Sequence, residues 1–230
     1  MRVLGLLGGM SWESSVEYER LINQAVREQL GGANSADLIV RSFNFADIEK
    51  LQANGNWEAA GQLLSDAAQK LEAAGAEGIV LCTNTMHVLA EEIARSVSIP
   101  LIHIADATGE AITRSGISRV LLLGTRYTME KDFYKSRLKD RFGLEVSTPS
   151  EDQRAEIHRI IYHELVRGIV NDHSRSFFLN VVDEFRDAGV QGVIAGCTEI
   201  ELLVKPEHVE VAYFPTTKIH SDAAAAFALR

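Results

Sequence analysis

The 230-residue chain is 46% hydrophobic and 24% charged, proportions typical of a globular protein with a substantial core. Its net charge is −9 and its basic residues are scattered, which argues against binding to nucleic acid or to an anionic membrane surface. The two cysteines, Cys82 and Cys197, are too few for a disulfide framework. No run approaches the ~20 apolar residues of a membrane helix, and the first residues lack the flanks of a signal peptide. We therefore expect a cytoplasmic protein.

Taken in chain order, short apolar runs predict buried strands, and amphipathic periodicity predicts the helices between them. Ser11 is a suitable N-cap for the first helix, and Ser150 with Gln153 forms a capping box before a later one. Residues 44–55 are polar and are expected to form a long loop. The expected strands are 3–7, 37–43, 78–82, 100–104, 120–124, 144–147, 192–196 and 209–214. The expected helices are 11–30, 57–74, 84–96, 150–166, 174–188 and 216–229, with one more after residue 125.

One stretch of this pattern occurs twice. Residues 188–199 repeat residues 74–85 without a gap, so that Cys197 stands 114 positions after Thr83. In each copy, a helix that ends at glycine leads into an apolar strand and then into small polar residues. Gly124 and Tyr134 similarly follow Gly8 and Tyr18 at a common spacing of 116 positions, which indicates that the opening strand-turn-helix unit is duplicated too.

Strands that alternate with helices predict right-handed βαβ units and parallel sheets. The fold class is therefore α/β, with two pseudo-symmetric lobes, each a parallel sheet flanked by helices. Because a further strand follows each copy of the repeat, we expect each lobe to borrow from the other. The first lobe is placed at residues 1–98 plus 208–230, and the second at residues 99–207.

Ligands of open α/β sheets bind beyond the carboxyl ends of the strands. Both copies of the repeat place hydroxyl, amide or thiol groups there, next to helix starts whose free N–H groups favour a carboxylate or a phosphate. At any single position the same residues also serve as ordinary N-caps. The glycines at 5–9 do not match the dinucleotide fingerprint, no P-loop occurs, and the seven histidines have no ligand spacing with the cysteines. No metal ion or nucleotide is expected.

Cys197 is the strongest candidate for chemistry. It follows Gly196 at a strand end and precedes a helix, where we expect the helix dipole to lower the pKa of its thiol. A thiolate is a nucleophile or a base on carbon. If Thr83, its equivalent in the other lobe, faces the same ligand, two groups lie on opposite sides of one carbon, which is the geometry of racemisation. His87, just after the first turn, is either a packing residue or a support for the site.

Three ordered motifs carry a resemblance to a known family over essentially the whole chain. They are residues 5–12 (GLLGGMSW), residues 83–87 (TNTMH) and residues 196–199 (GCTE). The chain resembles the aspartate/glutamate racemase family, and within it the enterobacterial amino-acid racemases, including a broad-specificity type. The resemblance implies two flavodoxin-like lobes, an active site at the lobe interface, no pyridoxal phosphate or other cofactor, no metal and a homodimer. The partner it implies is a small-molecule amino-acid substrate.

The chain departs from the family at the first of two acid/base positions, where the family has Cys-Asn-Thr. The internal repeat places Thr83 opposite Cys197 and Cys82 opposite Gly196, so we interpret Cys82 as a buried structural residue. By the resemblance, Thr83 and Cys197 are the catalytic pair. The residues implied to bind substrate are Met10, Gln52, Asn84, Thr85, Thr198 and Glu199. Gln52, in a region where aspartate-specific members use cations, favours a broad or aspartate/glutamate-type specificity.

Two alternatives stay open. Maleate isomerase, hydantoin racemase and arylmalonate decarboxylase look similar, and the decarboxylase type also keeps only the second cysteine. A different class is a non-catalytic relative that binds an amino acid for sensing. Release of carbon dioxide from a disubstituted malonate distinguishes the decarboxylase, and ligand binding that survives replacement of Cys197 distinguishes the binding protein.

Overall fold

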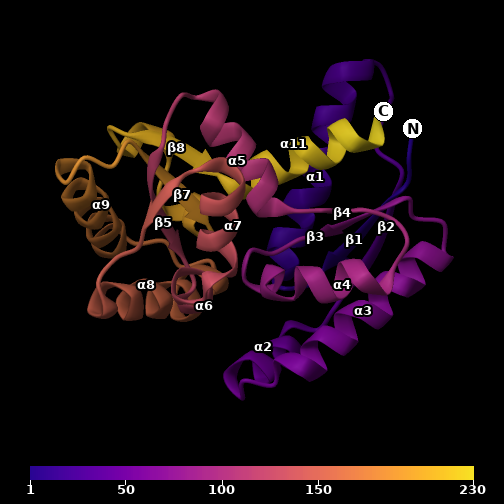
Figure 1. Cartoon of the computed structure of the whole chain (residues 1–230), viewed down its shortest axis with the longest axis horizontal. Coiled ribbons are helices and arrows are strands. Elements are labelled where there is room, and N and C mark those ends of the chain that lie inside the picture. Colours follow the sequence, from indigo (N-terminus) through magenta and orange to yellow (C-terminus); the bar gives the residue numbers. More distant parts are fainter. The chain divides into compact units, whose positions relative to one another are not determined.

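The computed structural model describes all residues from 1 to 230, and the chain falls into two compact units. Unit 1 comprises Met1–Ile104 and His220–Arg230, and unit 2 comprises Ala105–Ile219. Each unit holds one four-stranded parallel sheet with helices on it (Figure 1). None of the helices combines the length and the apolar character that a membrane crossing requires.

In unit 1 the strand order is β2-β1-β3-β4, and every neighbouring pair is parallel. The strands are β1 (Leu4–Gly8), β2 (Leu38–Ser42), β3 (Gly78–Leu81) and β4 (Leu101–Ile102). The helices are α1 (Trp12–Leu30), α2 (Phe45–Ala53), α3 (Trp57–Ala73), the 3-10 helix η1 (Thr85–Leu89), α4 (Ala90–Ser96) and most of α11 (Thr216–Ala228).

Unit 2 repeats this topology, with the order β6-β5-β7-β8 and all pairs parallel. The strands are β5 (Arg119–Gly124), β6 (Glu145–Ser147), β7 (Gly192–Gly196) and β8 (Ala212–Pro215). The helices are α5 (Ile104–Arg114), α6 (Arg126–Glu130), α7 (Asp132–Phe142), α8 (Glu151–His163), α9 (Asp172–Asp187) and α10 (Ile200–Leu203), with 3-10 helices η2 (Leu165–Arg167) and η3 (Pro206–His208). The predicted fold class, with two equivalent parallel α/β lobes, is confirmed.

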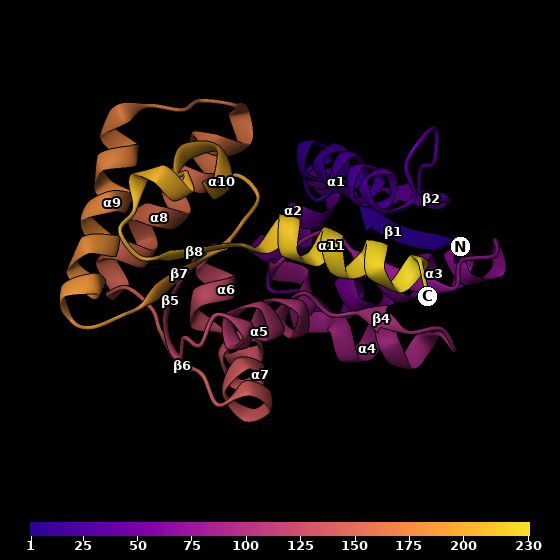
Figure 2. The same cartoon turned by 90° about the horizontal axis from the view of Figure 1, so that it is seen from above.

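Alternation along β3 explains how the sheet of unit 1 is covered on both faces. Ile79 and Leu81 belong to the core cluster under α2, α3 and α4, whereas Val80 and Cys82 belong to the cluster under α1 and α11. Figure 1 shows α1 and α11 above the strands of unit 1 and α3 and α4 below them, and in Figure 2 both α1 and α11 lie next to β1. Burying each aliphatic side chain contributes roughly 1.5–3 kcal/mol, so the sheet resists any shift in register. The register in turn fixes where Thr83 leaves the strand.

Two local predictions differ from the structure, and one helix was missed. The expected loop at 44–55 contains α2, whose buried residues Ile48 and Gln52 are one helical turn apart. The expected helix at 84–96 is a 3-10 turn followed by α4, and helix α5 was not predicted. The capping box of Ser150 and Gln153 at the start of α8 is confirmed.

The strand exchange expected between the lobes is not observed. β4 pairs with β3 in the sheet of unit 1, and β8 pairs with β7 in the sheet of unit 2. The units therefore change at 104/105 and 219/220, later in the chain than the seams placed near 98 and 207. Only the helix after the last strand of each sheet belongs to the other unit. Helix α5, which follows β4, belongs to unit 2, and α11, which follows β8, belongs largely to unit 1. The physical reason is that each last strand completes the hydrogen bonding of its own sheet before the chain crosses.

Candidate functional site

Each sheet has one pair of neighbouring strands after which the chain continues towards opposite edges of the sheet. In unit 1 this pair is β1 and β3, and in unit 2 it is β5 and β7. Ligands of open parallel sheets bind at the carboxyl ends of such strands. Met10 and Thr83 follow the two strands of unit 1, and Cys197 follows β7 in unit 2. Met10, Thr83 and Cys197 therefore lie at strand ends where this fold class places ligands, the first two in unit 1 and the third in unit 2.

Thr83 is the partly exposed residue in a buried turn. Its neighbours Cys82, Asn84 and Thr85 are buried. The N–H of Thr83 donates to the carbonyl oxygen of Leu81 at 2.8 Å, and its own carbonyl accepts from Nδ1 of His87 at 2.6 Å. Both backbone polar groups of Thr83 are thus fixed, and its β-branched side chain has few rotamers. The hydroxyl of Thr83 is therefore held in a narrow range of directions.

Cys82 lies in the core, as predicted. Its side chain is fully buried beside β1 and α1, and burial raises the pKa of its thiol. The thiol makes a long 3.7 Å hydrogen bond to the carbonyl oxygen of Val80. A buried, protonated thiol on the apolar face of a strand is unreactive.

The turn after β1 differs from its counterpart after β5. Ser11 caps α1 by accepting from the N–H of Ser14 at 3.4 Å, and Thr125 caps α6 in the same way at 3.3 Å. Thr125 directly follows its strand, but Gly9 and Met10 intervene before Ser11. Met10 is buried in this two-residue extension and has no equivalent in unit 2.

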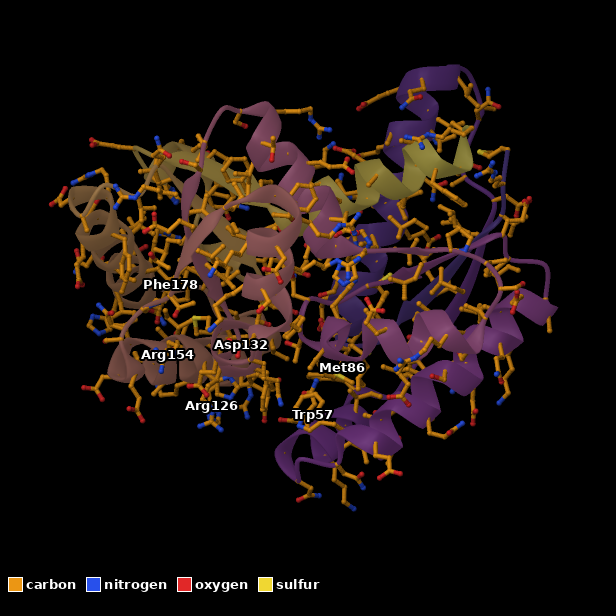
Figure 3. The ribbon with its side chains drawn as sticks, viewed as in Figure 1. Trp57, Met86, Arg126, Asp132, Arg154 and Phe178 are labelled. Atoms are coloured by element: carbon orange, nitrogen blue, oxygen red, sulfur yellow. The ribbon has the colours of Figure 1, made fainter.

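Gln52 is buried in α2, and its side-chain amide donates to the sulfur of Met86 at 3.0 Å. Met86 belongs to the core cluster against which Trp57 packs (Figure 3). Gln52 thus lies beside the segment that carries Asn84 and Thr85. A contact between Gln52 and a substrate stays a prediction.

Cys197 is a protonated thiol next to a carboxylate. Its side chain is 8% exposed, and Sγ donates to Oε2 of Glu199 at 2.9 Å. Burial, and next the negative charge of Glu199, raise the pKa of the Cys197 thiol well above its usual value. The sequence predicts that the helix dipole lowers this pKa, and this prediction is wrong. Helix α10 starts three residues later, at Ile200, and is one turn long, so it does not offset the two opposing effects.

The start of α11 supports the turn that carries Cys197. Thr198 accepts from the hydroxyl of Thr217 at 3.3 Å, and the N–H of Thr217 donates to Oε1 of Glu201 at 3.2 Å. The hydroxyl of Thr216 donates to the carbonyl oxygen of Ala195, the last residue but one of β7, at 2.7 Å. These bonds tie the end of β7 to the first turn of the last helix.

Sequence reasoning missed a buried histidine cluster in unit 1. His220 on α11 accepts from the hydroxyl of Tyr18 at 2.8 Å and donates to the carbonyl oxygen of Ile102 at 2.7 Å. Its ring lies 5.6 Å from that of His87, which lies 4.7 Å from that of His103. His220 and Tyr18 are 202 positions apart, and no local pattern signals their meeting. The structure contains no group of three or more His, Cys, Asp or Glu side chains suited to a metal ion.

Comparison with known proteins gives a consistent result. The family model described as Asp/Glu/hydantoin racemase matches residues 7–224. The chain is 28% identical over 150 residues to the broad-specificity amino-acid racemase RacX of Bacillus subtilis (strain 168). That alignment covers 63% of this chain and 61% of RacX, less than two thirds of the relative.

Two solved structures match over the full length of both chains. One is that of a candidate Asp/Glu racemase from Yersinia pestis, with 52% sequence identity and a TM-score of 0.94. The other is an aspartate racemase homologue from Pyrococcus horikoshii OT3, with 34% identity and a TM-score of 0.87.

Proposed function

Because this chain belongs to the Asp/Glu/hydantoin racemase family, we propose that it interconverts the L- and D-forms of an amino acid without a cofactor. The observation that carries the proposal is the equivalence of Thr83 and Cys197. Each follows the third strand of a sheet with the same strand order, and each belongs to a different unit. Two units that each contribute one proton-transferring group suit a reaction at a single stereocentre approached from both sides.

In the proposed reaction, one group removes the α-proton and the bonding electron pair stays on the α-carbon. The opposite group then delivers a proton to the other side of that carbon, which inverts it. The half-reaction at Cys197 uses the thiol as an acid in one direction. In the other direction the thiolate is the base, and the thiol proton first passes to Glu199, which lies 2.9 Å away. Well-placed acids and bases of this kind each contribute about 10²–10⁴-fold to a rate.

A threonine hydroxyl is a weak base, so the Thr83 half-reaction is proposed to be the slower one. The hydroxyl takes the α-proton as its own proton passes to a water molecule, and the reverse transfer delivers a proton to the carbon. The α-carboxylate of the substrate is assigned to the side chains and N–H groups of Asn84, Thr85 and Thr198. Met10 and Gln52 are assigned to the substrate side chain. Since Gln52 hydrogen-bonds without demanding charge, we propose a broad set of substrates that includes aspartate, glutamate and homoserine. RacX, a relative, is described as having broad specificity. We also propose that the protein is a cytoplasmic homodimer.

The test is incubation of single L- and D-amino acids in deuterated water without added cofactor, followed by chiral chromatography and by the α-proton signal in NMR. The wild type should racemise the substrate and incorporate one deuteron per inversion. Cys197→Ser should lower the rate by at least about 10²-fold. Cys82→Ser is the matched control, and it should retain most of the activity of the folded protein.

Equal damage by the two cysteine substitutions would contradict the assignment of Cys197. If no amino acid shows exchange while a disubstituted malonate loses carbon dioxide, the chain is a decarboxylase of the same family. If amino acids bind with unchanged affinity to the wild type and to Cys197→Ala, and neither shows exchange, the chain is a binding protein.

A further inference from the structure

His87 has a defined protonation pattern in the structure. The side chain is 2% exposed, its Nδ1 lies 2.6 Å from the carbonyl oxygen of Thr83, and the N–H of Ile104 donates to its Nε2 at 3.2 Å. A carbonyl oxygen only accepts, so Nδ1 carries the proton. A backbone N–H only donates, so Nε2 is bare. The ring is therefore neutral and protonated on Nδ1.

This imidazole connects two places that matter to the proposed reaction. On one side it holds the carbonyl of Thr83, whose N–H is already bonded to Leu81. On the other side it holds Ile104, the first residue of α5 and the last residue of unit 1 before the chain crosses. The ring itself is held by its contacts with the rings of His103 and His220. A fixed ring between two backbone groups fixes the backbone of Thr83.

Unit 2 contains a counterpart that shows what is special about His87. Glu201 stands four residues after Cys197, as His87 stands four after Thr83, and its Oε1 accepts from the N–H of Thr217 in the first turn of α11. Each side chain therefore accepts from an N–H in the first turn of the helix within which the chain passes from one unit to the other. The carbonyl of Cys197, however, accepts from the N–H of Ile200 at 3.1 Å, a backbone bond. In unit 1 a side chain holds the corresponding carbonyl.

We propose that His87 is a positioning residue for the half-reaction at Thr83. It holds the Thr83 carbonyl and thereby aims the hydroxyl, and it needs a proton on Nδ1 to do so. The inference rests on the proposed racemase function. A misplacement of a reacting group by about 1 Å costs on the order of 10²-fold in rate, which sets the scale of the expected effect.

Three substitutions separate the two bonds of the ring. His87→Asn puts an amide N–H near the position of Nδ1 and keeps a donor for Thr83, but it loses the acceptor for Ile104. His87→Gln reaches the position of Nε2 and keeps the acceptor for Ile104, but it loses the donor for Thr83. His87→Phe keeps an aromatic ring of similar size and loses both bonds. Each substitution also disturbs the packing of the buried ring, so the decisive comparison is between His87→Asn and His87→Gln, which both replace the ring by an amide and differ in the bond that they keep.

The measurement is the loss of an α-deuteron to ordinary water, followed by NMR for each pure, labelled enantiomer separately. The enantiomer deprotonated by Thr83 is identified as the one whose exchange slows in Thr83→Val. For that enantiomer, His87→Gln and His87→Phe should slow exchange by about 10–100-fold, and His87→Asn should restore it to within about threefold of wild type. Exchange of the other enantiomer should change by less than about threefold in all three variants.

The inference fails if His87→Asn and His87→Gln slow exchange equally, or if both enantiomers are affected to the same extent, because a purely structural role predicts either pattern. It also fails if ¹⁵N NMR of the imidazole places the proton on Nε2. A wild-type protein that exchanges neither enantiomer overturns the proposed function itself. The two failures are therefore distinguishable.

Discussion

Acid should destabilise unit 1 through His220. The imidazole is fully buried on α11, and burial lowers its pKa to about 4 from the usual 6.5, although the hydrogen bond to Ile102 opposes the shift. The folded protein therefore holds this side chain neutral while the unfolded chain protonates it. Its contribution to stability is complete above pH 6.5 and is lost as the pH falls towards 4. The gap between the two values corresponds to about 3 kcal/mol of unfolding free energy.

The assay is urea denaturation between pH 7 and pH 4, followed by tryptophan fluorescence. Both tryptophans of the chain, Trp12 and Trp57, lie in unit 1, so the signal reports the unit that contains His220. The comparison is with His220→Gln, whose amide can still donate to the carbonyl of Ile102 and does not titrate in this range. Other groups that titrate between pH 7 and pH 4 contribute equally to both proteins and cancel in the difference.

Across this pH range the wild type should lose about 3 kcal/mol more stability than His220→Gln. The variant is expected to be the less stable protein at pH 7, because it lacks the full contact with Tyr18. Its curve should approach or cross that of the wild type near pH 4. Parallel curves would refute the reasoning, since they would mean that His220 is protonated to the same extent in the folded and the unfolded chain.

Three further outcomes are expected. Gly9→Ala should lower the unfolding free energy by at least about 3 kcal/mol, because the residue has a φ of +82° and a Cβ there would lie 2.2 Å from backbone atoms. Gly143→Ala is the control: its φ is +66°, but no atom lies within 4 Å of the added Cβ, so it should lower the unfolding free energy by only about 1 kcal/mol. Glu199→Gln should speed alkylation of Cys197 by iodoacetamide, since the carboxylate, after burial, raises the pKa of that thiol, and it should nevertheless slow racemisation. Slower alkylation would mean that Glu199 does not raise the pKa of Cys197. Ser150→Ala should lower the free energy of unfolding by about 1 kcal/mol, measured by thermal unfolding, because it removes the side-chain cap of α8. An unchanged stability would mean that another group caps the helix in its place.

The strands and their duplication were predictable because they depend on local patterns. The apolar runs before Thr83 and Cys197 are short, are preceded by glycine and alternate between two buried faces, and all of these features can be read from the residues themselves. The cap at Ser150 was predictable for the same reason, since the residues of a capping box lie within one turn. Helix α2 was missed because one of its two buried residues is Gln52, which carries no apolar signal.

The state of the site could not be predicted from local patterns. The pKa of Cys197 depends on whether the rotamer of Glu199 brings its carboxylate to the sulfur, and on burial that comes from distant helices. The neutral state of His220 depends on its burial in the tertiary fold, and the proposed role of His87 depends on where β4 ends and α5 begins. Each of these features joins segments that only the tertiary fold brings together.

The two units have kept their sheets and have diverged in the turns that follow them. Gly196 cannot carry a side chain, because a Cβ would lie 2.7 Å from the carbonyl oxygen of Leu123, whereas the equivalent Cys82 fits into the core of unit 1. A thiol at position 82 cannot substitute for one at position 83, since successive side chains of a strand point to opposite faces. The divergence leaves a thiol with a carboxylate partner in unit 2, and a hydroxyl with a histidine-held backbone in unit 1. In the proposed reaction, a sulfur acid/base needs control of its charge, while a weaker oxygen base gains most from fixed geometry, so the different neighbours of the two groups suit the roles proposed for them.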